Sequence, residues 1–391
     1  MWRDNITNFF RKPSTPVIFW FAASVIIPLI QYFQGRYNNY LIFKGVFYHT
    51  WEQKPLYKAY PAEYWDTNHY GPLFSLMIAP FAMLPDVIGV VLWALFTTWL
   101  LYKSIMLLPL SITQRTTMLW ICFVELTTSL HSLQVNPAIV AWVFFTYIFI
   151  EKKKEGAAAL SILLGFYIKI YGITALALGV FAKRKFRLAL FLLAGSILLF
   201  VLPMLISSPD FIIASYKDWG TSLSEKNLQN TGVLEGGDMQ NISVMGMISR
   251  IFDLPQLSVL VVLIPAGIIM LLPLLRFKQY VYQHFRLYYV AAILLSIVLF
   301  STGSESPTYI IAVAGAALFF TLQQRPFKPW ILFLLIFMLI LTSLSPTDIF
   351  PRGIRNTFIK PYSLKALPCL LVWLTIMYQL ITKKTFALEA Q

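Results

Sequence analysis

Apolar runs long enough to cross a membrane dominate this sequence and limit it to one broad class of fold. The hydrocarbon core of a bilayer is about 30 Å thick, which takes about 20 residues of helix. Charged residues make up only 12% of the chain, whereas soluble domains contain about 25%. The runs cover approximately residues 17–33, 72–84, 87–108, 117–131, 136–150, 156–182, 187–207, 256–276, 287–302, 307–322, 329–345 and 366–382. We therefore expect an all-α polytopic membrane protein.

The net charge of +14 arises from 31 Lys and Arg against 17 Asp and Glu. On a soluble chain this excess would favour nucleic acid, but here the charges belong to loops beside a bilayer, so we expect no nucleic-acid partner. Cys122 and Cys369 lie within apolar runs, and the sequence has no CxxC pair or Cys and His cluster with metal-ligand spacing. This pattern excludes a disulfide framework and a zinc site.

The distribution of positive charge predicts which segments face the cytoplasm. Short segments between the apolar runs hold 17 Lys and Arg in 54 residues, whereas the long polar loops 35–72, 208–255 and 346–365 hold 11 in 106. Cytoplasmic loops carry the excess of Lys and Arg, so the three long loops face outward and both termini lie in the cytoplasm. Because no internal repeat is visible, we expect one membrane domain over residues 1–391.

One apolar run, residues 156–182, has a cationic cluster at each end and Lys169 at its centre. If both ends lie inside, each half of about 13 residues reaches only ~20 Å, short of the bilayer core. We predict a broken hairpin there. The run of residues 73–84, which contains Pro80, is likewise too short to cross and is predicted to be re-entrant or interfacial.

The first outer loop, 35–72, is rich in aromatic residues and carries Glu63, Asp66 and His69. Aromatic side chains at this density either stack on sugar rings or form a belt at the membrane interface. The loop is much longer than a simple connection needs to be, which favours a functional role.

Two groups of cations could bind phosphate. Lys169 lies mid-membrane, where an unpaired charge is costly, so we expect an anionic partner that is either Glu125 or a lipid phosphate. Arg352 and Arg355 in the last outer loop could also hold phosphate, or could simply be solvated. No GxGxxG or Walker pattern is present to cradle a nucleotide. An outward-facing transferase would therefore need a lipid-carried donor.

Short motifs follow one another in a defined order: Asn38-Asn39-Tyr40, Lys54-Pro55-Leu56-Tyr57, His69-Tyr70-Gly71-Pro72, Pro80 to Pro85 with Leu92-Trp93, Leu133-Gln134-Val135-Asn136, Gly165 to Tyr171, and Gln240-Asn241-Ile242-Ser243. In order and spacing this series resembles glycosyltransferase family 87, over roughly residues 17–323. That family belongs to the GT-C superfamily and includes polyprenyl-phosphate-mannose-dependent α-1,2-mannosyltransferases of bacterial envelopes.

The resemblance implies a GT-C-like bundle of about 11–13 transmembrane or half-membrane helices in the bacterial inner membrane. Its cavity would take a polyprenyl-phosphate sugar, and a glycan or glycolipid would accept the sugar. Lys169, Arg352 and Arg355 are the candidates for the donor phosphate. The candidates for substrate binding are Tyr40, His69, Tyr70, Gln134, Asn136, Tyr171, Trp219 and Asn241.

The resemblance also implies that the first outer loop carries the catalytic acid. Counting back from Gly45 places that acid at Asn38, which is not a base. Transfer from a phosphate needs one carboxylate to take the acceptor proton and cations to stabilise the leaving group, so no metal or cofactor is expected. Asp66 and Glu63 are therefore the leading candidates for the base.

Two alternatives to a transferase stay open. Glu125 and Lys169 within the membrane would suit a transporter or flippase of a lipid-linked saccharide, although no repeated broken helices are visible. A non-catalytic GT-C-like subunit would suit Asn38 at the acid position. The long, asymmetric outer loops favour the transferase over the transporter.

Overall fold

The computed structural model describes residues 9–10, 12–232, 240–255 and 257–386, and within these ranges the chain forms helices and no strands. Among the described residues, three helices are long and apolar enough to cross a membrane: α2 (Ser14–Phe33), α5 (Asp86–Leu107) and the segment Lys185–Leu205 formed by α9 and η2. Shorter apolar helices of 10–17 residues accompany them. The predicted fold class is confirmed. Both termini are predicted to be cytoplasmic, and their residues 1–8 and 387–391 lie outside the described residues.

The chain divides into two compact units, residues 1–109 with 126–225 and residues 110–125 with 226–391. Helices α6 (Ile112–His131) and α10 (Pro209–Asn230) each contribute to both units. The expectation of a single membrane domain stays a prediction.

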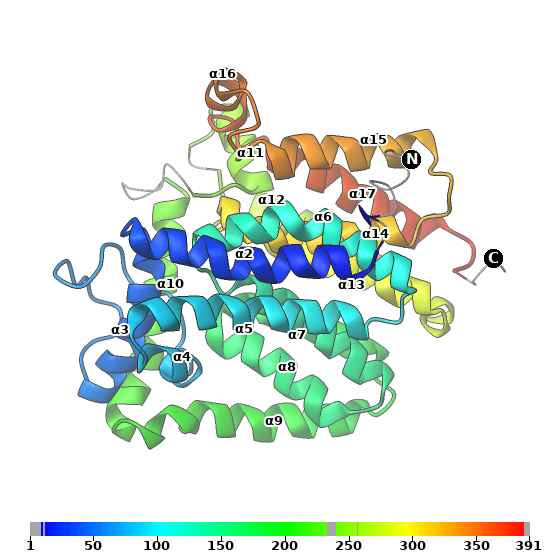
Figure 1. Cartoon of the computed structure of the whole chain (residues 1–391). Helices are drawn as coiled ribbons and strands as arrows, with labels where there is room; N and C mark the ends of the chain where they lie inside the picture. The colour runs from blue at the N-terminus through cyan, green and yellow to red at the C-terminus, as the bar shows by residue number, and fades with distance from the viewer. Residues whose placement is uncertain (1–8, 11, 233–239, 256, 387–391) are drawn as a thin grey trace. The chain divides into compact units, whose positions relative to one another are not determined.

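Five helices of the first unit lie side by side in the order α2, α5, α7, α8 and α9 (Figure 1). Almost every side chain of α7 (Asn136–Glu151) is buried, because α5 covers one side and α8 (Glu155–Ile168) the other. In contrast, α9 (Lys185–Val201) buries only Leu188 and Leu199. Its exposed apolar surface suits contact with lipid.

The predicted broken hairpin is confirmed. Helix α8 ends at Ile168, Lys169 adopts an extended backbone, and the 3-10 helix η1 (Ile170–Phe181) follows. A Cβ atom at Gly172 would lie 2.1 Å from the carbonyl carbon of Gly165. Seven residues of continuous helix would separate these positions by about 10.5 Å, so the chain folds back on itself at Lys169.

Helix α4 (Phe74–Ala82) has 9 residues, so it is about 13 Å long and cannot cross the bilayer. This length agrees with the predicted re-entrant or interfacial segment at residues 73–84. Helix α4 packs against α3 (Asn38–Glu52), which begins the first outer loop.

Two of the predicted outer loops contain a long helix that the sequence does not predict. Helix α3 covers 15 residues of the loop 35–72, and α10 covers 22 residues of the loop 208–255. Eight residues of α3 are buried, and four of them, Tyr40, Phe43, Phe47 and Thr50, are spaced by three or four residues, the period of a helix face. The abundance of aromatic and polar residues on all faces hides this period.

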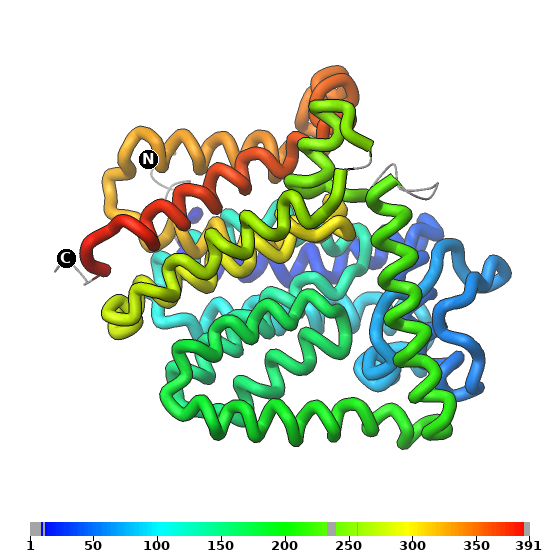
Figure 2. The backbone as a smooth tube through the Cα atoms, turned by 180° about the vertical axis from the view of Figure 1, so that it is seen from behind, coloured from blue at the N-terminus to red at the C-terminus, as the bar shows by residue number. Residues whose placement is uncertain are grey.

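The second unit is built on three helices that pack on one another, α13 (Gln283–Leu299), α14 (Tyr309–Thr321) and α17 (Ala366–Thr382) (Figure 2). Every residue of α14 is buried. A Cβ atom at Gly315 would lie 2.6 Å from the carbonyl oxygen of Ala291, so the glycine allows α13 and α14 to approach closely. The other elements of this unit are α11 (Val244–Ile251), α12 (Leu260–Leu271), η3 (Leu272–Leu275), η4 (Phe277–Val281), η5 (Ser306–Thr308), α15 (Pro329–Phe337), the π-helices η6 (Met338–Leu344) and η7 (Arg355–Ile359), and α16 (Arg352–Ile354).

Candidate functional site

Five of the predicted site residues meet at the break between α8 and η1. The ammonium of Lys169 donates a hydrogen bond to Asn136 Oδ1 at 3.1 Å. It lies 5.6 Å from the ring centroid of Tyr70 and 5.1 Å from that of Tyr171. The amide of Asn136 donates in turn to Gln134 Oε1 at 2.6 Å, which fixes the direction of its oxygen. We call these five residues the lysine cluster.

The residues before α7 hold Gln134 and Asn136 in place. Leu133 has a positive φ of 51°, so the chain turns sharply after α6. The indole N–H of Trp93 donates to the Leu133 carbonyl at 2.8 Å and fixes that turn. Pro137, at the first turn of α7, suits a helix start because no partner is needed for its nitrogen.

Tyr70 is held from three sides. The side chain of Asn68 accepts a hydrogen bond from the Tyr70 backbone N–H at 2.9 Å, and the Tyr57 hydroxyl donates to the Tyr70 carbonyl at 2.9 Å. Burial raises the pKa of Tyr57, so this hydroxyl stays protonated and able to donate. The Tyr70 ring stacks on Phe74 with centroids 4.7 Å apart. The aromatic face beneath Lys169 is therefore rigidly placed.

Helix α10 brings His69 and Trp219 next to Tyr70. The Trp219 indole donates to the His69 carbonyl at 3.0 Å, and His69 Nδ1 lies 3.1 Å from the hydroxyl of Ser222. A Cβ atom at Gly71 would lie 2.1 Å from the Tyr167 carbonyl oxygen, so only glycine fits there. The loop, α8 and α10 thus converge beside the lysine cluster.

The two candidate bases have different surroundings. Asp66 is exposed, has a positive φ of 74°, and accepts a hydrogen bond from the Thr67 backbone N–H at 2.8 Å. The carboxylate of Glu63 is 46% exposed and lies 2.9 Å from the buried ring of His49. Glu63 therefore contacts His49 on α3, a partner that the sequence does not predict.

Asn38 uses both ends of its amide on the main chain of Trp65. Its Nδ2 donates to the Trp65 carbonyl at 2.6 Å, and its Oδ1 accepts from the Trp65 N–H at 2.9 Å. No feature of the sequence could have predicted this pairing across 27 residues. It places the supposed acid position one residue away from Asp66.

Two predicted substrate-binding residues have polar groups that serve the fold. Tyr40 is fully buried, and its hydroxyl donates to the Phe81 carbonyl at 2.9 Å. Asn241, in the second unit, donates to the Asn230 carbonyl at 3.0 Å and accepts from the Ser243 hydroxyl at 2.6 Å. Each of these side chains braces a turn or a helix end.

The two predicted arginines also lie in the second unit. Arg352 is exposed and lies 3.5 Å from Asp348, four residues earlier in the chain. Arg355 donates to the carbonyls of Pro346 and Thr347 at 3.2 and 3.1 Å and so braces its own loop. Of the two, Arg352 is the one whose charge faces solvent or lipid headgroups.

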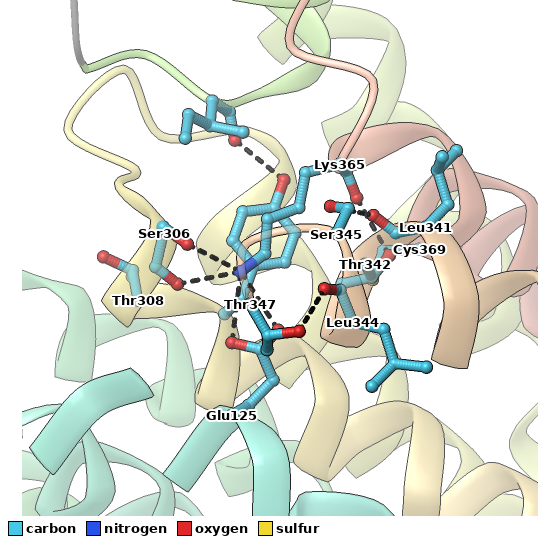
Figure 3. A network of polar contacts seen from close by, with 12 residues as sticks. Glu125, Ser306, Thr308, Leu341, Thr342, Leu344, Ser345, Thr347, Lys365 and Cys369 are labelled. Carbon is cyan, nitrogen blue, oxygen red and sulfur yellow. Dashed lines mark hydrogen bonds and ion pairs between the residues drawn. The ribbon is translucent and has the colours of Figure 1, made fainter. Parts of the chain in front are cut away.

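A buried ion pair that the sequence does not predict joins α6 to the start of α17 (Figure 3). Lys365 Nζ lies 3.0 Å from Glu125 Oε1, and the two side chains are 4% and 0% exposed. Lys365 also donates to the hydroxyl and the carbonyl of Ser306, at 2.9 and 3.2 Å. Glu125 therefore pairs with Lys365, which corrects the expectation that it could neutralise Lys169.

The same network fixes the backbone around Lys365 (Figure 3). The Thr342 hydroxyl donates to the Lys365 carbonyl at 2.9 Å, and the ammonium lies 4.7 Å from the ring centroid of Tyr309. The three N–H groups of Lys365 are matched by the Glu125 carboxylate and the two Ser306 oxygens. This arrangement anchors helices to one another and offers no donor to a substrate.

Comparison with known proteins gives one finding about the family. The sequence model of glycosyltransferase family 87 matches residues 68–302, more than half of the chain. The matched span includes the whole lysine cluster, together with His69 and Trp219. No curated protein sequence matches the chain.

Proposed function

The chain belongs to glycosyltransferase family 87, and from this premise we propose that it transfers a hexose such as mannose from a polyprenyl phosphate. The acceptor is a glycan or glycolipid at the outer face of the bacterial inner membrane. The observation that supports this proposal most is the lysine cluster, which combines a cation with two aromatic rings at a break in a membrane segment.

The lysine cluster suits the phosphate end of the donor. The contacts of Lys169 with Asn136, Tyr70 and Tyr171 orient the ammonium between the amide and the two rings. When the sugar departs, the negative charge on the phosphate grows, and a fixed cation stabilises that charge most in the transition state. The faces of Tyr70 and Tyr171 would line the path of the sugar or of the first isoprene unit.

Asp66 is the base in this proposal. An acceptor hydroxyl must lose its proton as it attacks, and an exposed carboxylate can take that proton. The segment from Asp66 to Tyr70 spans at most about 14 Å, so the base and the donor site belong to one short stretch of chain. Asp66→Asn should preserve donor binding and lower the rate constant of transfer by roughly 10² to 10⁴.

The test of the donor site is Lys169→Met, which keeps an unbranched side chain and removes the charge. Loss of a charge-assisted hydrogen bond should weaken binding of a polyprenyl-phosphate hexose by roughly 10- to 100-fold. Binding is measured in nanodiscs, with thermal unfolding recorded on the same samples.

Lys44→Met is the matched control. Lys44 lies 2.7 Å from Asp86 and 5.8 Å from the ring centroid of Tyr48, so it also combines a polar partner with an aromatic face. Its replacement should leave donor affinity unchanged. A stable Lys169→Met protein with wild-type donor affinity would contradict the donor site proposed here.

A further inference from the structure

The side-chain amide of Asn38 bonds both main-chain groups of Trp65, the two groups that a residue on a neighbouring β-strand would bond. Its amide donates to the Trp65 carbonyl and accepts from the Trp65 N–H, at 2.6 and 2.9 Å. The Trp65 indole is 73% exposed, so packing of the ring contributes little to holding this residue. The two main-chain bonds therefore carry the attachment.

The segment 63–65 lies along one face of α3. Glu63 meets His49 at 2.9 Å, and Trp65 meets Asn38. Between them, a Cβ atom at Gly45 would lie 2.7 Å from the ring of Tyr64, so that glycine admits the ring. Positions 38, 45 and 49 are spaced by seven and four residues, which places them on one stripe of a helix. The Asn38 amide is the last of three attachments before Asp66.

This attachment determines the backbone at Asp66. The Trp65 carbonyl belongs to the planar peptide group that joins Trp65 to Asp66, so holding the oxygen fixes that plane. Asp66 then turns through a φ of 74°, in the left-handed region that residues other than glycine rarely adopt. Such a conformation persists only where surrounding contacts enforce it.

We infer that Asn38 is the positioning residue of Asp66: the amide holds the Trp65–Asp66 peptide so that the carboxylate is presented to the acceptor. This inference rests on the proposed role of Asp66 as the base. It requires an amide at position 38, because a carboxylate has no N–H for the Trp65 carbonyl and would repel its oxygen. Asn38→Asp should therefore lower the rate of transfer, although it would supply an acid at that position.

A double-mutant cycle on kcat tests the inference. Asn38→Ala should lower kcat by roughly 10- to 100-fold, as expected for a misplaced catalytic group. In the Asp66→Asn background the same change should lower kcat by less than about twofold, because residues that act as a unit are not additive. If Asn38 only maintained the fold, the losses of kcat from Asn38→Ala and Asp66→Asn would multiply in the double variant.

Asn39→Ala is the matched control. Asn39 is the next residue on α3, and its amide donates to the Ser132 carbonyl at 2.7 Å instead of to Trp65. Whatever loss it causes should multiply with that of Asp66→Asn. Hydrogen exchange of the Trp65 amide gives a readout independent of activity: Asn38→Ala should accelerate it about fivefold, and Asn39→Ala should not.

The outcomes separate this inference from the proposed function. Multiplicative losses for Asn38→Ala and Asp66→Asn, or an Asn38→Asp enzyme as active as the wild type, would overturn the positioning role and leave Asp66 as the base. An unaffected Asp66→Asn enzyme would overturn both roles. Absence of transfer by the wild type from any polyprenyl-phosphate hexose would overturn the proposed function itself.

Discussion

Lys169 and Lys365 differ in the groups that contact the ammonium. Lys365 meets the buried carboxylate of Glu125, whereas Lys169 meets an amide oxygen and two rings. Lys365→Met would leave the buried Glu125 carboxyl without its ion-pair partner, at a cost of roughly 3–5 kcal/mol in the free energy of unfolding. Thermal unfolding in detergent should therefore show a much larger loss of Tm for Lys365→Met than for Lys169→Met.

A second substitution checks the cause of that loss. If the unpaired carboxylate is responsible, adding Glu125→Leu to Lys365→Met should recover much of the lost stability, because an apolar pair often replaces a buried ion pair at little cost. A double variant less stable than Lys365→Met would mean that the Ser306 contacts of Lys365, and not its charge, are what matters.

At this scale the sequence indicated the members of the lysine cluster one by one and did not indicate the contacts that join them. Lys169 was identifiable because a cation amid apolar residues is rare, and Tyr70 and Asn136 because they belong to recognisable motifs. Lys365 lies at the end of a polar loop, where a cation needs no explanation. Its pairing with Glu125 spans 240 positions, and nothing in either local sequence indicates the other.

The break between α8 and η1 is the element that places Lys169, and two glycines allow it. A Cβ atom at Gly172 would lie 2.1 Å from a backbone atom of Gly165, and backbone cannot move aside as a flexible side chain can. Gly172→Ala should therefore separate the two arms, lower stability by about 1–3 kcal/mol and weaken donor binding together. Gly220→Ala in α10, where no atom lies within 4 Å, is the control and should be neutral or slightly stabilising.

The length of an apolar run was enough to predict the break between α8 and η1. Helix α3 depends on which of its side chains are buried, and the sequence did not predict it. The apolar run 156–182 has a cationic cluster at each end, and each of its halves is too short to cross the bilayer, which predicts the break. The sequence predicts a loop where α3 lies, because Lys, His, Asn and aromatic residues are typical of a surface segment. Its helical period becomes visible only once the partners that bury Tyr40 and Phe47 are known.

For the whole molecule, the hairpin agrees with the topology that the distribution of cations predicts. Lys153 lies in the turn between α7 and α8, and Arg184 in the turn between η1 and α9. Because the chain folds back at Lys169, both turns lie at the open end of the hairpin, and both are rich in Lys and Arg. The predicted outer loops would then lie on the opposite side of the membrane.

Cysteine labelling in intact cells tests this topology. Cys122 and Cys369 are buried, so an impermeant thiol reagent should react only with introduced cysteines. Lys58→Cys in the first outer loop should react in intact cells, whereas Lys153→Cys and Arg184→Cys should react only after the membrane is permeabilised. If Lys153→Cys and Arg184→Cys reacted from opposite sides, the chain between these two positions would have to cross the bilayer once, which a hairpin does not do. Lys169 would then be a residue of an ordinary span, and the reason for expecting a lipid phosphate beside it would be lost.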